Sequence, residues 1–508
     1  MIKKFIYIGM AFISILSCNK DLNEANIESY KYTNLDAIGG SWKPILVSKP
    51  EDITVNTPVE VTKDEFKILV SDMLSFSANA TQSQLDSIKV FGGNSIVKWN
   101  DIARALAAKY NLPPAANSDG TYPAPSSINP GVYPYFPFAN PPYASRAFAY
   151  WSAAQFDGMI VTWYYKYKFN RPAVYNHDNT ITTLLPKQDL PGGISEDAVI
   201  ATISKEMLSF LFPLEASYLD GLANTHKNSR IWAKMNTKDE IEAGSIIGKQ
   251  IADKFIAKAK GDGMGKAAVN VTTTDSIGNA ALAKFGWKWK SLESPARPGL
   301  LPQFGKVKMW CIPNVELVRP PAPPAPTSDE FKNDVAEMLH YTKNQTEESR
   351  RIANFWADGP SSSTPPGHWN QIASEQIALS KLNPIRSARV FAYMNMAIED
   401  AGIACWDAKY YYFTPRPTQI DPNIKTLIGL PNFPGYISGH STFSSAGATV
   451  LSYFFPTETT KFNNYANDAS NSRIYGCIHF RHDCKVGLEV GKNVGQYSLG
   501  IAKVDGAQ

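Results

Sequence analysis

The sequence has 508 residues, more than one compact core usually holds, so we expect two domains or one large composite helical domain. Apolar residues make up 44% and charged residues 19%, which is typical of globular proteins and excludes wholesale disorder. The formal charge is only +4, from 50 Lys and Arg against 46 Asp and Glu. No nucleic-acid partner is therefore indicated, because that would need a concentrated basic face.

The first 17 residues have the character of a bacterial signal peptide. Two lysines precede an apolar run, Phe5–Leu16, that is too short to span a bilayer. Ser17 followed by Cys18 resembles the lipobox of bacterial lipoproteins, in which the cysteine is lipidated, although Ile15 stands where Leu is usual. The alternative is an ordinary secretory signal. Both predict export, and the first predicts a lipid anchor on a cell-envelope membrane, in the periplasm or at the outer membrane, as the only membrane attachment.

Four further cysteines follow at Cys311, Cys405, Cys477 and Cys484. In an oxidising compartment they permit two disulfides in any of three pairings, and the sequence does not choose among these. None lies in a CxxC motif, so a zinc site is not favoured.

Residues 18–61 are polar and predict a tether with an irregular lead-in, and residues 62–327 predict an N-terminal helical domain with long loops. Apolar residues recur at helical spacing from residue 62 and over 97–110, 144–168, 195–227 and 238–260. Thr237, with Glu240 three residues later, predicts a capping box for the last of these helices. The Gly- and Pro-rich stretches 112–143 and 291–327 indicate loops.

Residues 328–508 predict a second helical domain, with Thr327 or Ser328 as its first N-cap. Helical spacing covers 328–357, 368–382, 385–408, 439–455 and 484–502. Alternating strand patterns are scarce and no repeat of 20–50 residues is visible. The predicted fold class is therefore all-α, with two bundle-like halves.

Three clusters near the C-terminus carry groups suited to a tetrahedral oxyanion. The first has Lys409 and Arg416-Pro417, the second is Ser438-Gly439-His440, and the third has Ser472-Arg473, His479 and Asp483. Arginine forks bind oxyanion oxygens bidentately, and lysine adds a point charge. A serine hydroxyl and a glycine N–H can donate to the remaining oxygens. One histidine can bond the central atom while the other moves protons.

In this order and spacing, the clusters resemble the three-part signature of the PAP2 phosphatase/haloperoxidase superfamily, K-x6-RP, PSGH and SR-x5-H-x3-D. The sequence departs from it at one position, Ile437, where the signature has Pro. The resemblance implies a helical-bundle catalytic domain over 328–508. It also implies one of two chemistries at His479: a phosphohistidine in a phosphatase, or a bond to vanadate in a haloperoxidase.

The flanking residues favour the vanadium chloroperoxidase branch. The stretch Asp400–Lys409, with Trp406, is similar to the corresponding run in fungal-type chloroperoxidases, as is the stretch Pro431–Phe443. Phe433 falls where chloroperoxidases carry Phe and algal bromoperoxidases carry His. Upstream, Phe355–Ile372 is similar to the segment whose aspartate pairs with the acid–base histidine, and here that aspartate is Asp358.

The resemblance implies the following roles. His479 would be the axial vanadate ligand, and His440 would take the proton from incoming hydrogen peroxide. Asp358 would pair with His440 and raise its basicity, and Asp483 would orient the ligand region. The equatorial oxygens would be held by Lys409, Arg416, Ser438, Gly439 and Arg473, and the halide approach would be lined by Trp406, Pro431 and Phe433. Halide would be oxidised to hypohalous acid without a redox cofactor.

Two other hypotheses remain open at this stage. One is an acid phosphatase that hydrolyses phosphate monoesters and needs phosphate or no cofactor. The other is an exported protein that only binds anions, although binding alone would not need two histidines. His482 beside Asp483 could mimic a metal pair, and His368 could ligate, but packing or capping roles are favoured for such residues.

Overall fold

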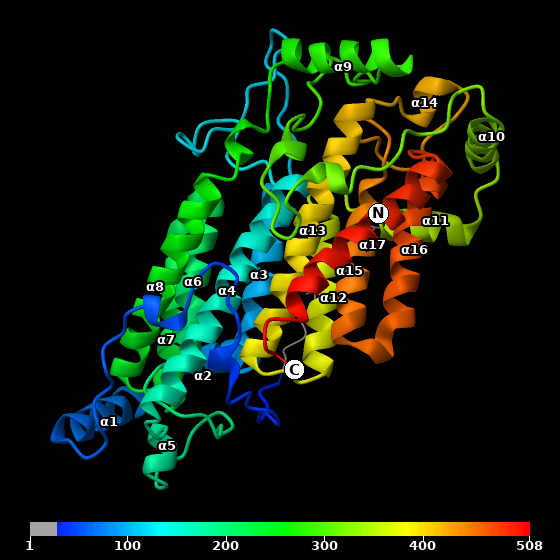
Figure 1. Ribbon diagram of the computed structural model, residues 1–508. Helices are drawn as coiled ribbons and strands as arrows, with labels where there is room; N and C mark the ends of the chain where they lie inside the picture. Colours follow the sequence, from blue (N-terminus) through cyan, green and yellow to red (C-terminus); the bar gives the residue numbers. More distant parts are fainter. Residues whose placement is uncertain (1–27, 508) are drawn as a thin grey trace, which may run out of the picture.

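The computed structural model describes residues 28–507, and within that range it contains helices, turns and loops but no strand (Figure 1). The predicted all-α class is confirmed. The signal segment 1–17 and Cys18 lie outside the described residues. The lead-in is irregular as predicted, with two short 3-10 turns at Gly39–Ser41 and Pro50–Asp52.

The N-terminal half is built on the long helix α4, which is preceded by three shorter helices and followed by a helical hairpin. The helices are α1 (Asp64–Ser77), α2 (Gln82–Gly92), α3 (Ser95–Tyr110), α4 (Pro141–Phe169), α5 (Val174–His177), α6 (Glu196–Leu211), α7 (Ala216–Trp232), α8 (Lys238–Lys260) and α9 (Val271–Phe285).

The C-terminal half is built in the same way on α13. Its helices are α10 (Asp329–Lys343), α11 (Glu347–Phe355), α12 (Thr364–Leu379), α13 (Pro384–Tyr412), α14 (Pro417–Ile420), α15 (Gly439–Phe454), α16 (Thr459–Tyr475) and α17 (Arg481–Ala502).

The two central helices, α4 and α13, pack against each other and join the halves (Figure 1). Each starts with an asparagine N-cap followed by proline, Asn140-Pro141 and Asn383-Pro384, a combination suited to a first helical turn. Both are buried on nearly all sides, which is why neither has a clear polar face in the sequence. The α15–α17 pair packs on the other side of α13.

Two predicted helices are each divided in the structure. The stretch 195–227 breaks at Phe212-Pro213, because proline cannot continue the hydrogen-bond ladder of α6. The stretch 328–357 breaks between α10 and α11, where Thr346 caps a new helix. The N-cap of α10 is Ser328, and the capping box at Thr237 is confirmed.

Five helices of the described part of the chain were not predicted: α2, α9, α16 and the short helices α5 and α14. The α16 sequence, TTKFNNYANDASNSRIY, is rich in Asn and Ser, which are weak helix formers, so periodicity alone does not reveal it. Tertiary packing against α15 and α11 supplies its stability.

The four cysteines beyond Cys18 are all free thiols, so neither of the two permitted disulfides is present. Among residues 28–507, no helix is long and apolar enough to cross a membrane.

Candidate oxyanion-binding active site

The three motif segments meet around the first turn of α15. The first motif ends α13 and leads into α14, the second forms the start of α15, and the third joins α16 to α17. The N–H of Ser438 donates to the Asp483 carbonyl at 3.0 Å, which ties the second motif to the third. The fold thus brings together residues that lie far apart in the sequence.

Lys409 lies in the last turn of α13 and is fully buried. Its Nζ donates to the carbonyls of Pro434 at 3.0 Å and Gly435 at 2.6 Å, which holds the preceding loop against α13. Burial, together with the nearby Arg416 guanidinium, lowers the pKa of Lys409 to about 7.

Arg416 is also fully buried, just before α14. Its Nε donates to the Phe433 carbonyl at 2.9 Å, and its Nη1 lies 2.9 Å from both the Ile478 carbonyl and His479 Nε2. Its Nη2 is buried without a hydrogen-bond partner. Burial, with a contribution from Arg473, lowers the pKa of Arg416 to about 10.

Arg473 is held at the C-terminal end of α16. Its Nε donates to Ser472 Oγ at 2.9 Å, and its Nη2 donates to the Trp356 carbonyl. Burial lowers its pKa to about 10, against the opposing effect of Asp358. Three buried cations therefore converge here, each with the pKa lowered because its charge is poorly solvated.

Ser438 is the N-cap of α15, as expected if the Ile437 departure preserves the turn. Its Oγ accepts from the Ser441 N–H at 3.3 Å and from Ser441 Oγ at 2.9 Å. Gly439 and His440 then form the first turn, where helix N–H groups and the helix dipole favour an anion.

His479 is fixed by the carboxylate of Asp483. Its Nδ1 lies 2.9 Å from Asp483 Oδ2, an oxygen that also accepts from the Phe480 N–H at 3.2 Å. If Nδ1 carries the proton, Nε2 faces the guanidinium of Arg416 with its lone pair. Burial and the Arg416 charge hold the pKa of His479 well below its usual range, so the ring is neutral, the form that ligates. This contact is of the kind that the orienting role implied for Asp483 would need.

The sequence analysis did not predict the charged contacts that His482 makes next to Asp483. His482 Nε2 lies 3.1 Å from Asp483 Oδ1, and its Nδ1 contacts the carboxylate of Asp334 on α10. Burial lowers the pKa of His482, but the two carboxylates outweigh it and raise the pKa to about 9. Nothing near Asp334 in the sequence signals this contact. The described residues hold no group of His, Cys, Asp and Glu that suits a metal cation.

The His482 charge predicts a pH-dependent stability. Because its pKa rises from 6.5 to about 9 on folding, the stabilisation is complete below pH 6.5 and is lost as the pH rises toward 9. We expect wild type to lose about 3 kcal/mol relative to His482→Phe over that range. Urea unfolding of both proteins at several pH values measures this. Equal pH dependence in both would contradict the assignment.

His440 and Asp358 lie together, but not as predicted. Asp358 Oδ2 is 3.7 Å from His440 Nε2, too far for a hydrogen bond, and His440 Nε2 is buried without one. Asp358 instead lies 3.2 Å from Nδ1 of His368, whose ring stacks on Trp356. Burial and the Arg473 charge hold the pKa of His440 well below its usual range.

The three residues predicted to line the halide approach come from two segments. Trp406 on α13 is buried, and its ring centroid is 5.0 Å from that of Phe433. The Phe433 ring in turn lies 5.1 Å from Lys409 Nζ and 5.0 Å from the Arg416 guanidinium. Pro431 is half-buried and accepts from the Phe433 N–H at 3.0 Å. An aromatic wall therefore borders the cations.

These residues fit a bound oxyanion. Three buried cations face one region, whereas the two nearest carboxylates, Asp358 and Asp483, each pair with histidines. Arg416 Nη2 and His440 Nε2 are buried polar atoms that lack hydrogen-bond partners. Such groups are costly unless a ligand satisfies them, and an anion would do so while neutralising the cations.

Gly439 offers a direct test of this interpretation. An added Cβ would lie 3.7 Å from Phe443 and 3.8 Å from Trp406, which is ordinary contact, so Gly439→Ala should leave the stability unchanged or higher. In the predicted donor set, however, the Gly439 N–H binds the anion, so an added methyl group would narrow the space left for it. We expect vanadate affinity, measured by calorimetry, to fall at least tenfold, or about 1.4 kcal/mol.

The matched control is Gly500→Ala on α17, where nothing lies within 4 Å of the added Cβ. That variant should keep its vanadate affinity. Full affinity in Gly439→Ala would place the anion elsewhere.

A family comparison classifies the segment that carries the three motifs. Residues 390–499 match the model of the PAP2 superfamily, which confirms the resemblance drawn from the three motifs. The matched range includes the cations, both histidines and Asp483. It leaves out Asp358 and the N-terminal half.

Particular relatives belong to the vanadium haloperoxidases. Vanadium chloroperoxidase from Curvularia inaequalis is 32% identical over 142 residues, covering 22% of this chain and 23% of that protein. The chain therefore matches less than a quarter of the length of that relative. The structure of a bacterial vanadium-dependent iodoperoxidase superposes with a TM-score of 0.59 at 22% identity, over 80% of this chain and 96% of the other. The structure of a bacterial vanadium-dependent chloroperoxidase superposes with a TM-score of 0.51 at 13% identity, over 77% of this chain and 98% of the other. The fold is that of these enzymes.

Proposed function

We propose that this protein is a vanadate-dependent haloperoxidase that oxidises halide with hydrogen peroxide to hypohalous acid. The observation that carries the proposal is the buried, neutral His479. Asp483 orients the ring, and Nε2 lies 2.9 Å from Nη1 of Arg416, one of three buried cations for which no carboxylate ion pair is found among the described residues. The fold and relatives described above support the same class.

The donor set predicts how vanadate would be held. His479 Nε2 would be the protein ligand, and the oxygens would be bound by Lys409, Arg416, Ser438, Gly439 and Arg473. When bound, vanadate would supply Lewis-acid activation of hydrogen peroxide toward halide. The cations would withdraw charge from the oxygens that they contact, and their burial would strengthen this effect.

His440 has the properties of a proton acceptor. Its lowered pKa keeps the ring neutral near pH 7, and its side chain is 16% exposed, although Nε2 itself is buried. Nε2 is free of hydrogen bonds and could accept a proton from hydrogen peroxide. Asp358, 3.7 Å away, could then stabilise the imidazolium that forms.

The aromatic wall of Trp406 and Phe433 would exclude water from the halide path while leaving the cations to attract the anion. Phe433 contacts both Lys409 and Arg416 through its ring face. A halide approaching here would be partly desolvated and drawn inward by charge.

The test is halide oxidation by the purified protein with hydrogen peroxide, before and after orthovanadate is added. We expect turnover of iodide or bromide only with vanadate. The alternative is an acid phosphatase, in which His479 would be the nucleophile. Efficient phosphate-ester hydrolysis by the vanadate-free protein, without vanadate-dependent oxidation, would support that alternative and overturn the proposal.

We also propose export and a lipid anchor at Cys18. The motivation is the basic and apolar segment that precedes Ser17-Cys18. Labelling with a fatty-acid probe should mark the wild-type protein and not Cys18→Ala. Equal labelling of both would contradict the anchor.

A further inference from the structure

The N-terminal half repeats the C-terminal half at a separation of 243 residues. Helices α4 and α13 have 29 residues each, α6 and α15 have 16, and α7 and α16 have 17. In each pair of helices, the two first residues are separated by this number, and so are the two last residues. Ser152 and Asn395, which are partners at this separation, hydrogen bond to each other between α4 and α13 at 3.3 Å.

Individual contacts repeat as well. Arg146 Nε donates to Asp262 at 2.6 Å, and Arg389 Nε donates to Asp505 at 2.7 Å. In both cases the Nη2 of the same arginine donates to a carbonyl in the last turn of the following long helix, α8 or α17. Sequence, helix length and buried contacts therefore agree on one register.

The same register pairs the active-site residues with residues of the N-terminal half. Lys166 Nζ donates to the carbonyl of Pro191 at 2.7 Å, as Lys409 Nζ does to Pro434. Arg230 Nε donates to the adjacent serine Oγ at 3.1 Å, as Arg473 does at 2.9 Å. The pairs are Lys166 with Lys409, Ser195 with Ser438, Arg230 with Arg473, Asn236 with His479, and Glu240 with Asp483.

The contact between His479 and Asp483 also has a counterpart in the N-terminal half. Asn236 Nδ2 donates to Glu240 Oε2 at 2.9 Å, the distance between His479 Nδ1 and Asp483 Oδ2. The Ser195 N–H donates to the Glu240 carbonyl at 3.0 Å, as that of Ser438 does to the Asp483 carbonyl.

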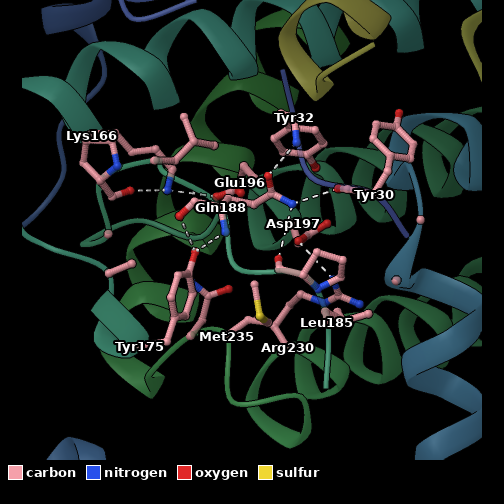
Figure 2. A pocket seen from close by; sticks show the side chains of 18 residues that line it. Tyr30, Tyr32, Lys166, Tyr175, Leu185, Gln188, Glu196, Asp197, Arg230 and Met235 are labelled. Carbon is pink, nitrogen blue, oxygen red and sulfur yellow. Dashed lines mark hydrogen bonds and ion pairs between the residues drawn. The ribbon is translucent and has the colours of Figure 1, made fainter. Parts of the chain in front are cut away.

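Three of the paired residues, Lys166, Arg230 and Asn236, border a cavity of about 40 Å³, shown in Figure 2. Four positions differ from the C-terminal site. Ala173 stands at the position of Arg416 and Asn236 at that of His479, and two carboxylates are added, with Glu196 at the position of Gly439 and Asp197 at that of His440. Lys166 Nζ is 3.0 Å from Glu196 Oε2, and Arg230 Nη1 is 3.4 Å from Asp197 Oδ2. Each buried cation of the cavity therefore has an internal carboxylate.

We infer that this cavity is a second oxyanion pocket of the duplicated fold, closed by the carboxylates of Glu196 and Asp197 in place of an external anion. The inference deepens the proposed function, because it takes the C-terminal pocket as an oxyanion site. Without these two carboxylates, the cavity would bind a tetrahedral oxyanion such as phosphate or vanadate.

Charge and burial explain why the internal anions are needed. The side chains of Lys166 and Arg230 are only 3% and 4% exposed, and cations so deeply buried require a counter-charge. The remaining nearby arginine, Arg171, is already paired with Asp239 at 2.6 Å and with Glu240 at 2.8 Å.

The test compares wild type with the double variant Glu196→Gly/Asp197→Asn, using inorganic phosphate in isothermal titration calorimetry. We expect the number of bound phosphates to rise by one, and phosphate to raise the Tm of the variant more than that of wild type. Adding Arg230→Met should remove the extra site. A folded double variant with unchanged stoichiometry, or an extra site that survives Arg230→Met, would overturn the inference.

A milder variant covers the case in which the double variant does not fold. Glu196→Gln removes one charge with little change in shape, and Glu206→Gln is its control on the same helix, where Glu206 pairs with Lys205 at 3.0 Å away from the cavity. Phosphate should raise the Tm of Glu196→Gln more than that of the control, and equal shifts would refute the inference. The proposed function is tested separately, by halide oxidation. If the C-terminal site bound no oxyanion at all, wild type would bind no phosphate, and the gain of one site in the double variant would remain measurable.

Discussion

His479→Ala is expected to abolish vanadate-dependent halide oxidation and to weaken vanadate binding by at least 100-fold. The variant removes the neutral imidazole nitrogen that lies 2.9 Å from Arg416 Nη1 and that Asp483 orients. Asp483→Asn should have a smaller effect, about 10- to 100-fold in affinity, because the ring would remain but lose its orienting carboxylate. Vanadate titration by calorimetry and iodide oxidation measure both effects.

A surface histidine provides the matched control. His340 lies exposed on α10, so His340→Ala should keep both affinity and turnover. Vanadate binding at wild-type strength in a folded His479→Ala protein would mean that the cations alone hold the anion, which would contradict the ligand assignment.

His440→Ala is expected to lower turnover strongly while it leaves vanadate affinity nearly unchanged. Loss of a general base typically lowers turnover by about 10² to 10⁴-fold. His440 does not contact the cations by a hydrogen bond, and its removal takes away no positive charge, because burial keeps the ring neutral. Vanadate affinity should therefore change by only a few-fold.

The measurement is kcat for bromide or iodide together with the calorimetric Kd for vanadate. A parallel fall in kcat and affinity would show that His440 holds the anion instead of moving a proton. The variant His368→Ala tests the role of Asp358 beside His440. It frees Asp358 from its 3.2 Å contact with His368, and it should alter the pH profile of turnover more than its maximum.

Much of the fold could be predicted, because the amphipathic helices carry clear periodicity. Helix α8, with its capping box at Thr237, agrees with the prediction, and α15 and α17 were placed to within a few residues. The failures have physical causes: Pro213 divides one predicted helix, and α16 is held by packing against its neighbours. Its Asn- and Ser-rich sequence has no strong apolar stripe.

The candidate site was predicted residue by residue from motifs, and the structure shows which of those residues lie together. Local spacing could not reveal contacts between distant elements, such as Asp334 on α10 with His482 on α17. It also could not show that His368, ten residues after Asp358, takes the hydrogen bond expected for His440. The duplication was missed because the two halves are paired over a span far longer than an ordinary repeat unit, with few identical residues.

The packing of α13 against α4 bears on how the chain unfolds. Helix α13 carries Lys409, yet much of its surface is covered by a helix from the other half of the molecule. Residues 328–508 on their own would expose that apolar face to water. We therefore expect that cutting the chain at the boundary predicted near residue 327 would not leave a stable C-terminal half. Calorimetric melting of the intact protein should show one cooperative transition, and limited proteolysis should not release a stable catalytic fragment.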